Sequence, residues 1–189
     1  TLFQSRSADA LRKHQYGGIV LLGQNVVTSE QTAQLVEDLQ ANNAAGAFSS
    51  NVPYLMAVDE EGGDVARCAE KLGATQFSTI YSYKDEGETV AHDNAKTIAE
   101  DIKQFGFNLD FAPVADVWTN PDNTVIADRA YSDNCEQAAE LVSSAIKGFH
   151  DGGVLCTLKH FPGHGDTTED SHDGLAYVSE TADELKSGA

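Results

Sequence analysis

Residues 134–160 read NCEQAAELVSSAIKGFHDGGVLCTLKH, and this stretch contains the unit from which the fold is built. Asn134 can cap a helix, and apolar residues then recur at intervals of three and four as far as a pair of glycines. An apolar run at 154–158 follows the glycines, as is typical of a parallel strand that is buried on both faces. The stretch therefore predicts an amphipathic helix and then a strand that ends at Lys159 and His160.

The same kind of unit occurs earlier in the chain. Three further strands are predicted from the apolar runs at 19–22, 54–58 and 108–116. Helices are expected after Thr28, where a capping-box pattern precedes apolar residues at helical spacing, and from Ala95. Strands that alternate with amphipathic helices predict an α/β protein with a parallel sheet.

Charged residues stand where the predicted strands end. Asp59 and Asp116 follow the second and third strands, and Lys159 with His160 follows the fourth. Chemistry at several strand ends favours a barrel, because a doubly wound sheet concentrates its site at one switch point. A full (β/α)8 barrel needs about 250 residues. We therefore expect residues 1–189 to form a single partial catalytic domain, an incomplete (β/α)8 TIM-type barrel that lacks the late strands.

The segment 59–67 combines acids, a glycine pair and an arginine directly after a strand. Proteins of the α/β class commonly place ligand-binding loops at this position, so we expect such a loop here. A plain acidic turn is the alternative interpretation. Residues 68–91 are weakly patterned, and no element is predicted there.

The composition limits the classes of partner. With 30 acidic and 12 basic residues, the chain has a formal net charge of -18, which repels the phosphate backbone of nucleic acids and anionic membrane surfaces. No stretch approaches the ~20 apolar residues of a membrane span, so none is predicted. The three cysteines lack C-x-x-C spacing, which argues against a disulfide framework and a zinc knuckle.

A dense polar segment, KHFPGHGD at 159–166 followed by DSH at 170–172, contains most of the residues suited to catalysis. One interpretation is a metal site, because His160 and His164 have the interval of the zincin pair. That pair requires a helix, which Pro162 and the glycine after it break. A looser site of carboxylates and imidazoles stays open.

The second interpretation is an Asp-His dyad. In an extended loop the side chains of Asp170 and His172 lie on the same side. Asp170 can then accept a hydrogen bond from one ring nitrogen and leave the other nitrogen free for proton transfer. The alternative is a pair of solvated polar residues.

The chain resembles glycoside hydrolase family 3, and within it the bacterial β-N-acetylglucosaminidase branch. The segments that carry the resemblance are GGIVLLGQN at 17–25, Asp59-x-Glu61-Gly62-Gly63, FAPVADV at 111–117, DRAYS at 128–132, KHFPGHG at 159–165 and DSH at 170–172. They follow the order of the family, and the resemblance covers nearly the whole chain.

The resemblance implies roles for particular residues. It makes His172 the general acid/base and Asp170 its orienting partner, which differs from the usual two-carboxylate scheme of glycosidases. His164 and Asp166 are expected to hold the shape of the loop. The residues implied to contact the sugar are Asp59, Arg67, Arg129, Lys159 and His160.

The resemblance also implies a reaction. The whole protein is expected to remove terminal β-linked N-acetylglucosamine with retention, as a β-N-acetylhexosaminidase in carbohydrate metabolism such as peptidoglycan turnover, and to need no cofactor or metal. The nucleophile of the family is an aspartate on a late barrel strand, so this chain alone is expected to be inactive. A β-glucosidase or β-xylosidase of the same family and a non-catalytic sugar-binding module are the alternatives. Unpaired strand edges in a partial barrel also predict self-association.

Overall fold

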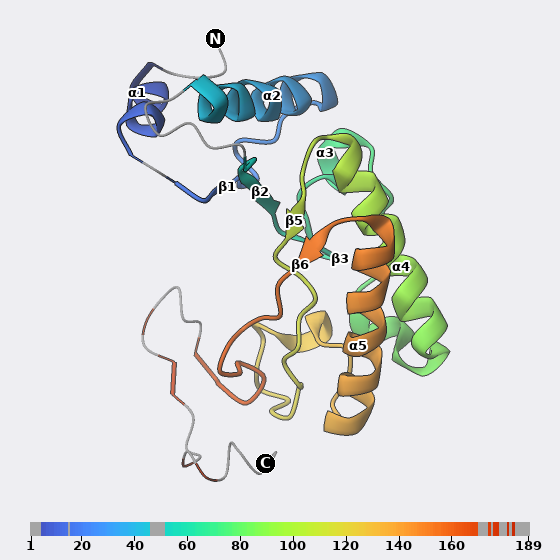
Figure 1. Cartoon of the computed structure of the whole chain (residues 1–189). Helices are drawn as coiled ribbons and strands as arrows, with labels where there is room; N and C mark the ends of the chain where they lie inside the picture. The colour runs from blue at the N-terminus through green and yellow to red at the C-terminus, as the bar shows by residue number, and fades with distance from the viewer. Residues whose placement is uncertain are drawn as a thin grey trace.

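Four parallel strands form the central sheet of the computed structural model, which describes residues 5–14, 16–45, 52–169, 174, 176–177, 181 and 183. Each neighbouring pair is parallel, and the order in space, β1-β2-β5-β6, is also the order along the chain (Figure 1). The strands of this sheet are β1 (Gly18–Val20), β2 (Leu55–Val58), β5 (Leu109–Asp110) and β6 (Leu155–Cys156). A parallel bridge between Val114 and Lys159 extends the pairing beyond β5 and β6.

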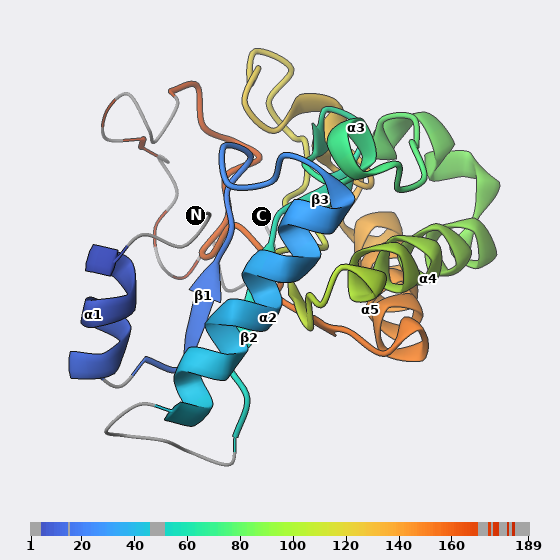
Figure 2. The ribbon, with the colours of Figure 1, turned by 90° about the horizontal axis from the view of Figure 1, so that it is seen from above.

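Helices follow the strands, as in a (β/α) barrel. The α-helices are α1 (Ser5–Lys13), α2 (Ser29–Ala45), α3 (Ala69–Leu72), α4 (Glu88–Gln104) and α5 (Cys135–Gly152), and the 3-10 helices are η1 (Ile80–Glu86) and η2 (Ala127–Arg129). Seen from two directions, α2 lies next to β1 and β2, while α4 and α5 lie side by side (Figures 1 and 2). The predicted α/β class with a parallel sheet is confirmed.

The predicted helix caps are present. The Thr28 hydroxyl accepts a hydrogen bond from the backbone N–H of Gln31 at 3.2 Å, and the Asn134 side chain accepts one from Gln137 at 3.0 Å. These bonds satisfy amide groups that have no partner within the first turn. The predicted apolar stripe of α5 also faces the core, since its members are buried or pack against buried residues.

Helices α4 and α5 pack in parallel with very close backbones. The Ser144 hydroxyl donates to Glu88 at 2.9 Å, Gly148 lies against the carbonyl of His92, and Gly152 lies against Lys96. A Cβ on Gly148 would stand 2.2 Å from that carbonyl oxygen. Small residues every fourth position of α5 therefore set the separation of the two helices.

Two segments in this region differ in detail from the sequence predictions. The segment 59–67, expected as a loop after a strand, contains an antiparallel hairpin of β3 (Glu60–Gly62) and β4 (Val65–Ala66). Helix α4 begins at Glu88 rather than Ala95, and its first turns are polar except for Val90 and Ala91. Ala91 is the only residue of the buried series before Ala95, so the pattern showed only the later part of the helix.

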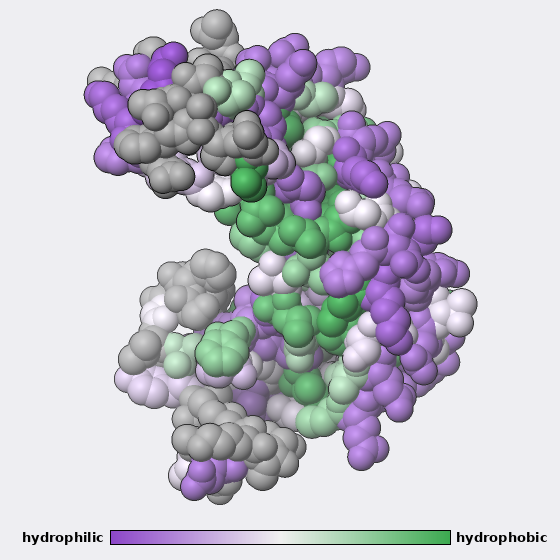
Figure 3. Space-filling model, viewed as in Figure 1, coloured by the Kyte–Doolittle hydropathy of each residue, from purple (hydrophilic) through white to green (hydrophobic). Residues whose placement is uncertain are grey.

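Apolar residues are exposed along the sheet. Figure 3 shows a hydrophobic surface on the concave side of the molecule, opposite the polar surface of α4 and α5. The large apolar side chains exposed on or beside the four strands are Val20, Leu22, Leu55, Leu155 and Leu158. Within the part of the chain that the structure describes, no helix is both long and apolar enough to cross a membrane.

Candidate active site

The carboxyl ends of β2, β5 and β6 bring charged side chains together. Asp59 follows β2, and Lys159 follows β6 at the bridge to Val114. Because parallel strands all end at the same edge of the sheet, residues 100 positions apart in sequence meet there. Lys159 Nζ donates to Asp59 Oδ1 at 2.7 Å.

Glu61 connects the cations of the site. Its carboxylate accepts two hydrogen bonds from Arg129, at 2.9 Å from Nε and 2.8 Å from Nη2, and lies 2.5 Å from Lys159 Nζ. The Glu61 side chain is only 1% exposed, whereas those of Lys159 and Arg129 are 14% and 19% exposed. Although burial alone would lower the pKa of Arg129, the hydrogen bonds and charge of Glu61 raise it above its ordinary value. We call Asp59, Glu61, Arg129 and Lys159 the strand-end cluster.

His160 is held on both sides of its ring. Nδ1 lies 2.6 Å from Asp116 Oδ2, and Nε2 lies 3.3 Å from Arg129 Nη2. A carboxylate only accepts and a guanidinium only donates, so both contacts are satisfied by the neutral ring with its proton on Nδ1. Neither nitrogen of His160 is then free to transfer a proton to a substrate.

Asp116 organises the start of the loop after β6. Its carboxylate also accepts the backbone N–H groups of His160 at 3.2 Å and His164 at 2.7 Å. Burial alone would raise the pKa of Asp116, but the hydrogen bonds from His160 and His164 lower it below its ordinary value. A cavity of about 220 Å³ borders Asp116, Lys159 and His160.

The loop residues His164 and Asp166 make structural contacts. His164 is buried, its Nδ1 contacts the Thr167 hydroxyl, and its carbonyl accepts from Asn123 Nδ2 at 2.6 Å. Asp166 accepts a hydrogen bond from the Thr119 hydroxyl at 3.1 Å. These contacts fit the prediction that both residues hold the shape of the loop. No group of three or more His, Cys, Asp or Glu side chains suited to a metal ion occurs among the described residues.

Buried acids lie beneath the strand-end cluster. The Glu60 carboxylate accepts the backbone N–H groups of Cys68 at 2.7 Å and Ala69 at 2.9 Å, at the start of α3. The backbone N–H of Glu60 donates to Asp110 Oδ1 at 3.0 Å. Burial raises the pKa of Glu60, and it raises that of Asp110 far above its usual value. These contacts fix the base of the hairpin that carries Glu61.

Residues 2–189 match the profile of the glycosyl hydrolase family 3 N terminal domain. The chain belongs to this family. The family 3 chain is 37% identical over 182 residues to the Beta-hexosaminidase A of Pseudoalteromonas piscicida. The aligned region covers 94% of this chain and 30% of that protein. It is 34% identical over 172 residues to the Beta-hexosaminidase of Idiomarina loihiensis, with 89% of this chain and 49% of the relative covered.

Solved structures of the family have the same fold as the family 3 chain. A glycoside hydrolase family 3 beta-N-acetylglucosaminidase from Paenibacillus sp. str. FPU-7 superposes with a TM-score of 0.87 at 35% identity, over 97% of this chain and 34% of the other. For native NagZ from Neisseria gonorrhoeae the TM-score is 0.84 at 30% identity, over 98% and 53% of the two chains. The chain thus spans between about a third and a half of the length of these relatives. The predicted family and the predicted barrel-type fold are confirmed.

The family 3 chain brings together most, but not all, of the residues predicted for the site. Asp59, Arg129, Lys159 and His160 converge as expected. Arg67 follows β4 and lies beside Gly23, with its Cδ 3.5 Å from the place of a Cβ on that glycine. Within the described ranges no hydrogen bond or ion pair joins Arg67 to the strand-end cluster. The roles of Asp170 and His172 stay predictions, because both residues lie outside the described residues.

Two residues with central contacts in the family 3 site, Glu61 and Asp116, were not assigned a role from the sequence. The alternation Asp59-x-Glu61 was the available signal for Glu61, because alternate residues of an extended segment face the same side. For Asp116 the signal was its place at a predicted strand end. Neither signal identifies a partner, since Arg129 is 68 positions from Glu61 and His160 is 44 from Asp116.

Proposed function

We propose that the complete gene product is a retaining glycoside hydrolase that removes terminal β-linked N-acetylglucosamine. The observation that carries the proposal is the strand-end cluster, in which Asp59, Arg129 and Lys159 converge around one buried carboxylate at the carboxyl edge of a parallel sheet. Charged donors and acceptors of this kind form strong hydrogen bonds with the hydroxyl groups of a sugar ring. The family, and relatives named beta-hexosaminidase and beta-N-acetylglucosaminidase, support the choice of sugar.

The remaining hydrogen-bonding capacity of the cluster suits a sugar hydroxyl. Lys159 directs two of its three N–H bonds at Asp59 and Glu61, which leaves one donor for a ligand. Asp59 is a quarter exposed and can accept a hydrogen bond from the same hydroxyl. A hydroxyl group both donates and accepts, so one hydroxyl of the sugar can bind Asp59 and Lys159 together.

Proton transfer is assigned to the pair Asp170 and His172. The contacts of His160 support this assignment, because Asp116 and Arg129 occupy both of its ring nitrogens. His164 cannot reach a substrate either, because it is buried: its Nδ1 contacts Thr167, and its Nε2 is enclosed in the protein without a partner among the described residues. With Asp170 as the acceptor for one ring nitrogen, His172 would present the other nitrogen to the glycosidic oxygen.

The domain assignment and the nucleophile belong to the same proposal. Residues 1–189 would form one part of a catalytic (β/α)8 barrel, and an aspartate on a later strand would attack the anomeric carbon. The acidic residues Asp59, Glu61 and Asp116 each bind a cation or a histidine already, and Asp110, the last residue of β5, is completely buried. The 189-residue chain alone is therefore expected to release no 4-nitrophenol from 4-nitrophenyl N-acetyl-β-D-glucosaminide.

The test compares the complete gene product on 4-nitrophenyl N-acetyl-β-D-glucosaminide, β-D-glucoside and β-D-xyloside. The first should be hydrolysed best, and NMR should show a β-configured product. His172→Ala should lower kcat by about 10²–10⁴-fold, the usual range for loss of a general acid/base, while Lys159→Ala should also raise KM. Binding of N-acetylglucosamine without hydrolysis would indicate a sugar-binding module instead. Preference for a glucoside or xyloside, or loss of activity with a chelator, would contradict the proposal.

A further inference from the structure

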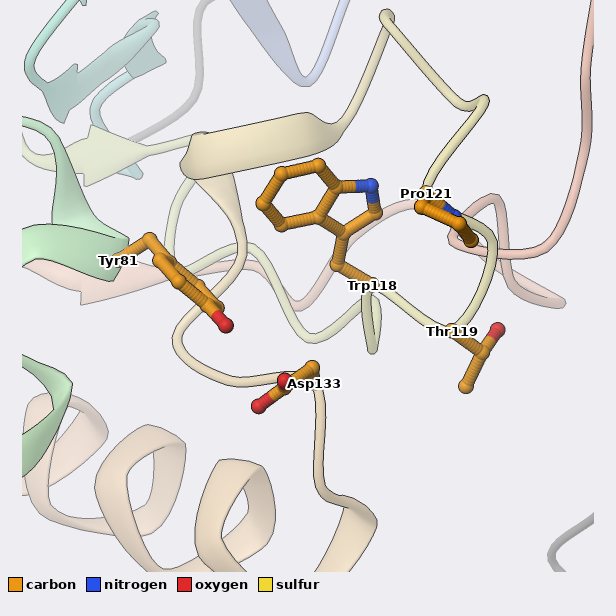
Figure 4. A pocket seen from close by; sticks show the side chains of 5 residues that line it. All are labelled: Tyr81, Trp118, Thr119, Pro121 and Asp133. Atoms are coloured by element: carbon orange, nitrogen blue, oxygen red, sulfur yellow. The ribbon is translucent and has the colours of Figure 1, made fainter.

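A second cavity, of about 440 Å³, lies outside the strand-end cluster. It is lined by Tyr81, Trp118, Thr119, Pro121 and Asp133 (Figure 4). Tyr81 comes from η1, residues 118–121 follow Asp116 in the segment after β5, and Asp133 precedes α5. Figure 4 shows Tyr81 on one side of the indole ring of Trp118 and Pro121 on the other.

The aromatic wall of this cavity is fixed by packing. Trp118 packs against the small buried group of Val114, Ile126 and Ala130. Its ring meets that of Tyr81 edge to face, with centroids 5.2 Å apart and an interplanar angle of 80°. The backbone N–H of Trp118 donates to Ser132 at 3.1 Å, which ties the two loops together. Rings held in this way lose little conformational entropy when a ligand binds.

The position of Trp118 is not explained by hydrogen bonding within the protein. Its Nε1–H is buried and has no hydrogen-bond partner among the residues that the structure describes. A buried donor without a partner costs about 1–3 kcal/mol. The large aromatic ring is therefore kept at this position for its contacts rather than for its polar group.

On the polar side of the cavity, the carboxylate of Asp133 is held in place by Lys84, which also offsets its negative charge. Lys84 Nζ donates to Asp133 Oδ1 at 3.0 Å and to the Tyr81 hydroxyl at 2.8 Å. The hydrogen bonds from Lys84 and Tyr81 lower the pKa of Asp133, so it stays ionised at neutral pH. Its side chain is 52% exposed and can accept a further hydrogen bond. The nearby ammonium offsets its charge, which favours a neutral ligand with hydroxyl groups.

We propose that this cavity, the aromatic pocket, binds a pyranose ring of an oligosaccharide. Because the rings of Trp118 and Tyr81 stand at 80° to each other, the C–H face of a sugar ring packs on one of them and its edge meets the other, while a hydroxyl donates to Asp133. The volume lies within the range of about 300–1,000 Å³ usual for ligand sites. The net charge of -18 disfavours an anionic ligand. That the sugar is N-acetylglucosamine rests on the proposed function.

The aromatic pocket belongs to the same end of the sheet as the strand-end cluster. Trp118 stands two positions after Asp116, and Thr119 binds Asp166 in the loop that begins at Lys159. None of the five lining residues is a member of the cluster. The pocket is thus an additional saccharide-binding site that favours oligosaccharides over single sugars.

Trp118 provides a direct readout, because it is the only tryptophan in the 189 residues. Titration of the chain with triacetylchitotriose should give a saturable change in tryptophan emission. Tyr81→Ala should raise the dissociation constant about tenfold, the equivalent of losing one aromatic contact. Asp133→Asn, which preserves shape, should raise it by a smaller factor. Tyr16→Ala removes an exposed tyrosine elsewhere and should leave the titration unchanged.

Circular dichroism shows whether each variant is folded, and Asp133→Asn decides the test if Tyr81→Ala unfolds. Absence of a saturable change, or equal dissociation constants in wild type, Tyr81→Ala and Asp133→Asn, would overturn the proposal. The fluorescence titration and the hydrolysis assay test the two proposals independently. Hydrolysis by the complete gene product without a tryptophan response refutes the aromatic pocket alone. A response that depends on Tyr81 supports the pocket even if no glycoside is hydrolysed.

Discussion

Glu61 shows at the scale of a single residue how the site is held together. Two cations, Arg129 and Lys159, share one carboxylate that is almost completely buried. Such a pair adds little net stability compared with an apolar replacement, because desolvation offsets the charge attraction. The loss of one partner, however, leaves the other charges without compensation. The arrangement therefore positions Arg129 and Lys159, and it is sensitive to change at one atom.

Glu61→Gln is expected to lower the free energy of unfolding by about 3 kcal/mol, because it removes the buried negative charge and leaves both cations in place. Urea unfolding of the chain at pH 7 measures this loss. Glu140→Gln makes the same chemical change on the exposed surface of α5 and should alter stability by less than about 0.5 kcal/mol. Equal stabilities of the two variants would show that Glu61 does not bear the buried charge.

The sequence could identify site residues that stand at strand ends, but not their partners. Asp59 and Lys159 were placed at strand ends because they directly follow apolar runs, which is a local pattern, and the family resemblance implied their contact with the sugar. The bidentate contact between Glu61 and Arg129 depends on the path of the chain across 68 positions. No local pattern contains that information. The same limit applied to the aromatic pocket, whose walls come from three separate segments.

At the scale of elements, the pairing of α4 and α5 depends on small residues. Replacing Gly148 by alanine favours the helix by about 1 kcal/mol in intrinsic propensity. The added Cβ would stand 2.2 Å from the carbonyl oxygen of His92, which is backbone and moves only if the helices separate. Because such overpacking typically costs about 1–3 kcal/mol and this contact is severe, the clash should prevail.

Gly148→Ala is therefore expected to lower the free energy of unfolding by about 1–2 kcal/mol net, measured by thermal or urea denaturation. Ser143→Ala, an exposed position of the same helix, is the matched control and should change stability little. A Gly148→Ala variant as stable as wild type would mean that the helices can separate without cost.

His92 links the same two helices through charge. Its Nδ1 lies 2.8 Å from Asp93 and its Nε2 lies 3.0 Å from Asp151 of α5. Hydrogen bonds to Asp93 and Asp151 raise the pKa of His92 above its value in an unfolded chain. The resulting stabilisation is complete below about pH 6.5 and is lost as the pH rises through the raised folded value.

Wild type should consequently exceed His92→Gln in stability at pH 5.5, and the difference should shrink toward pH 9. Denaturant unfolding at both pH values, at low and high salt, tests this expectation, because exposed charge pairs are screened by salt. A difference that grows with pH would reverse the sign and exclude the protonated histidine as its source.

Prediction of the elements succeeded where apolar periodicity was strong. The four strands and the caps at Thr28 and Asn134 follow from local patterns. The hairpin of β3 and β4 was missed because it is short and rich in glycine and acids, so neither strand has an apolar alternation. The start of α4 was missed because its first turns are mostly polar. The β3–β4 hairpin and the first turns of α4 are stabilised by packing against other segments rather than by local propensity.

At the scale of the whole molecule, the sheet has two open edges. Among the described residues, β1 and β6 each pair with one neighbour, and Leu155 and Leu158 are about half exposed at the β6 edge. Unpaired strands with apolar side chains favour pairing with another chain. The 189-residue chain is therefore expected to self-associate.

Light scattering across a range of concentrations measures this association. Replacing Leu155 and Leu158 together by lysine should shift the chain toward monomer, since charge on an edge strand opposes pairing. Exposed Val52 lies outside the four strands, and its replacement by lysine should leave the association unchanged. A monomer at every concentration would contradict the expectation.

The sequence separations within the strand-end cluster have a thermodynamic consequence. Its contacts join positions that are 68 and 100 residues apart, so the site exists only after both halves of the sheet have come together. A ligand of this site would bind the native state and not the unfolded chain. By mass action, a sugar present at a hundred times its dissociation constant would add about 2.7 kcal/mol to the stability of the whole sheet. Saturation with a saccharide would thus lower the unfolded fraction of the protein about a hundredfold.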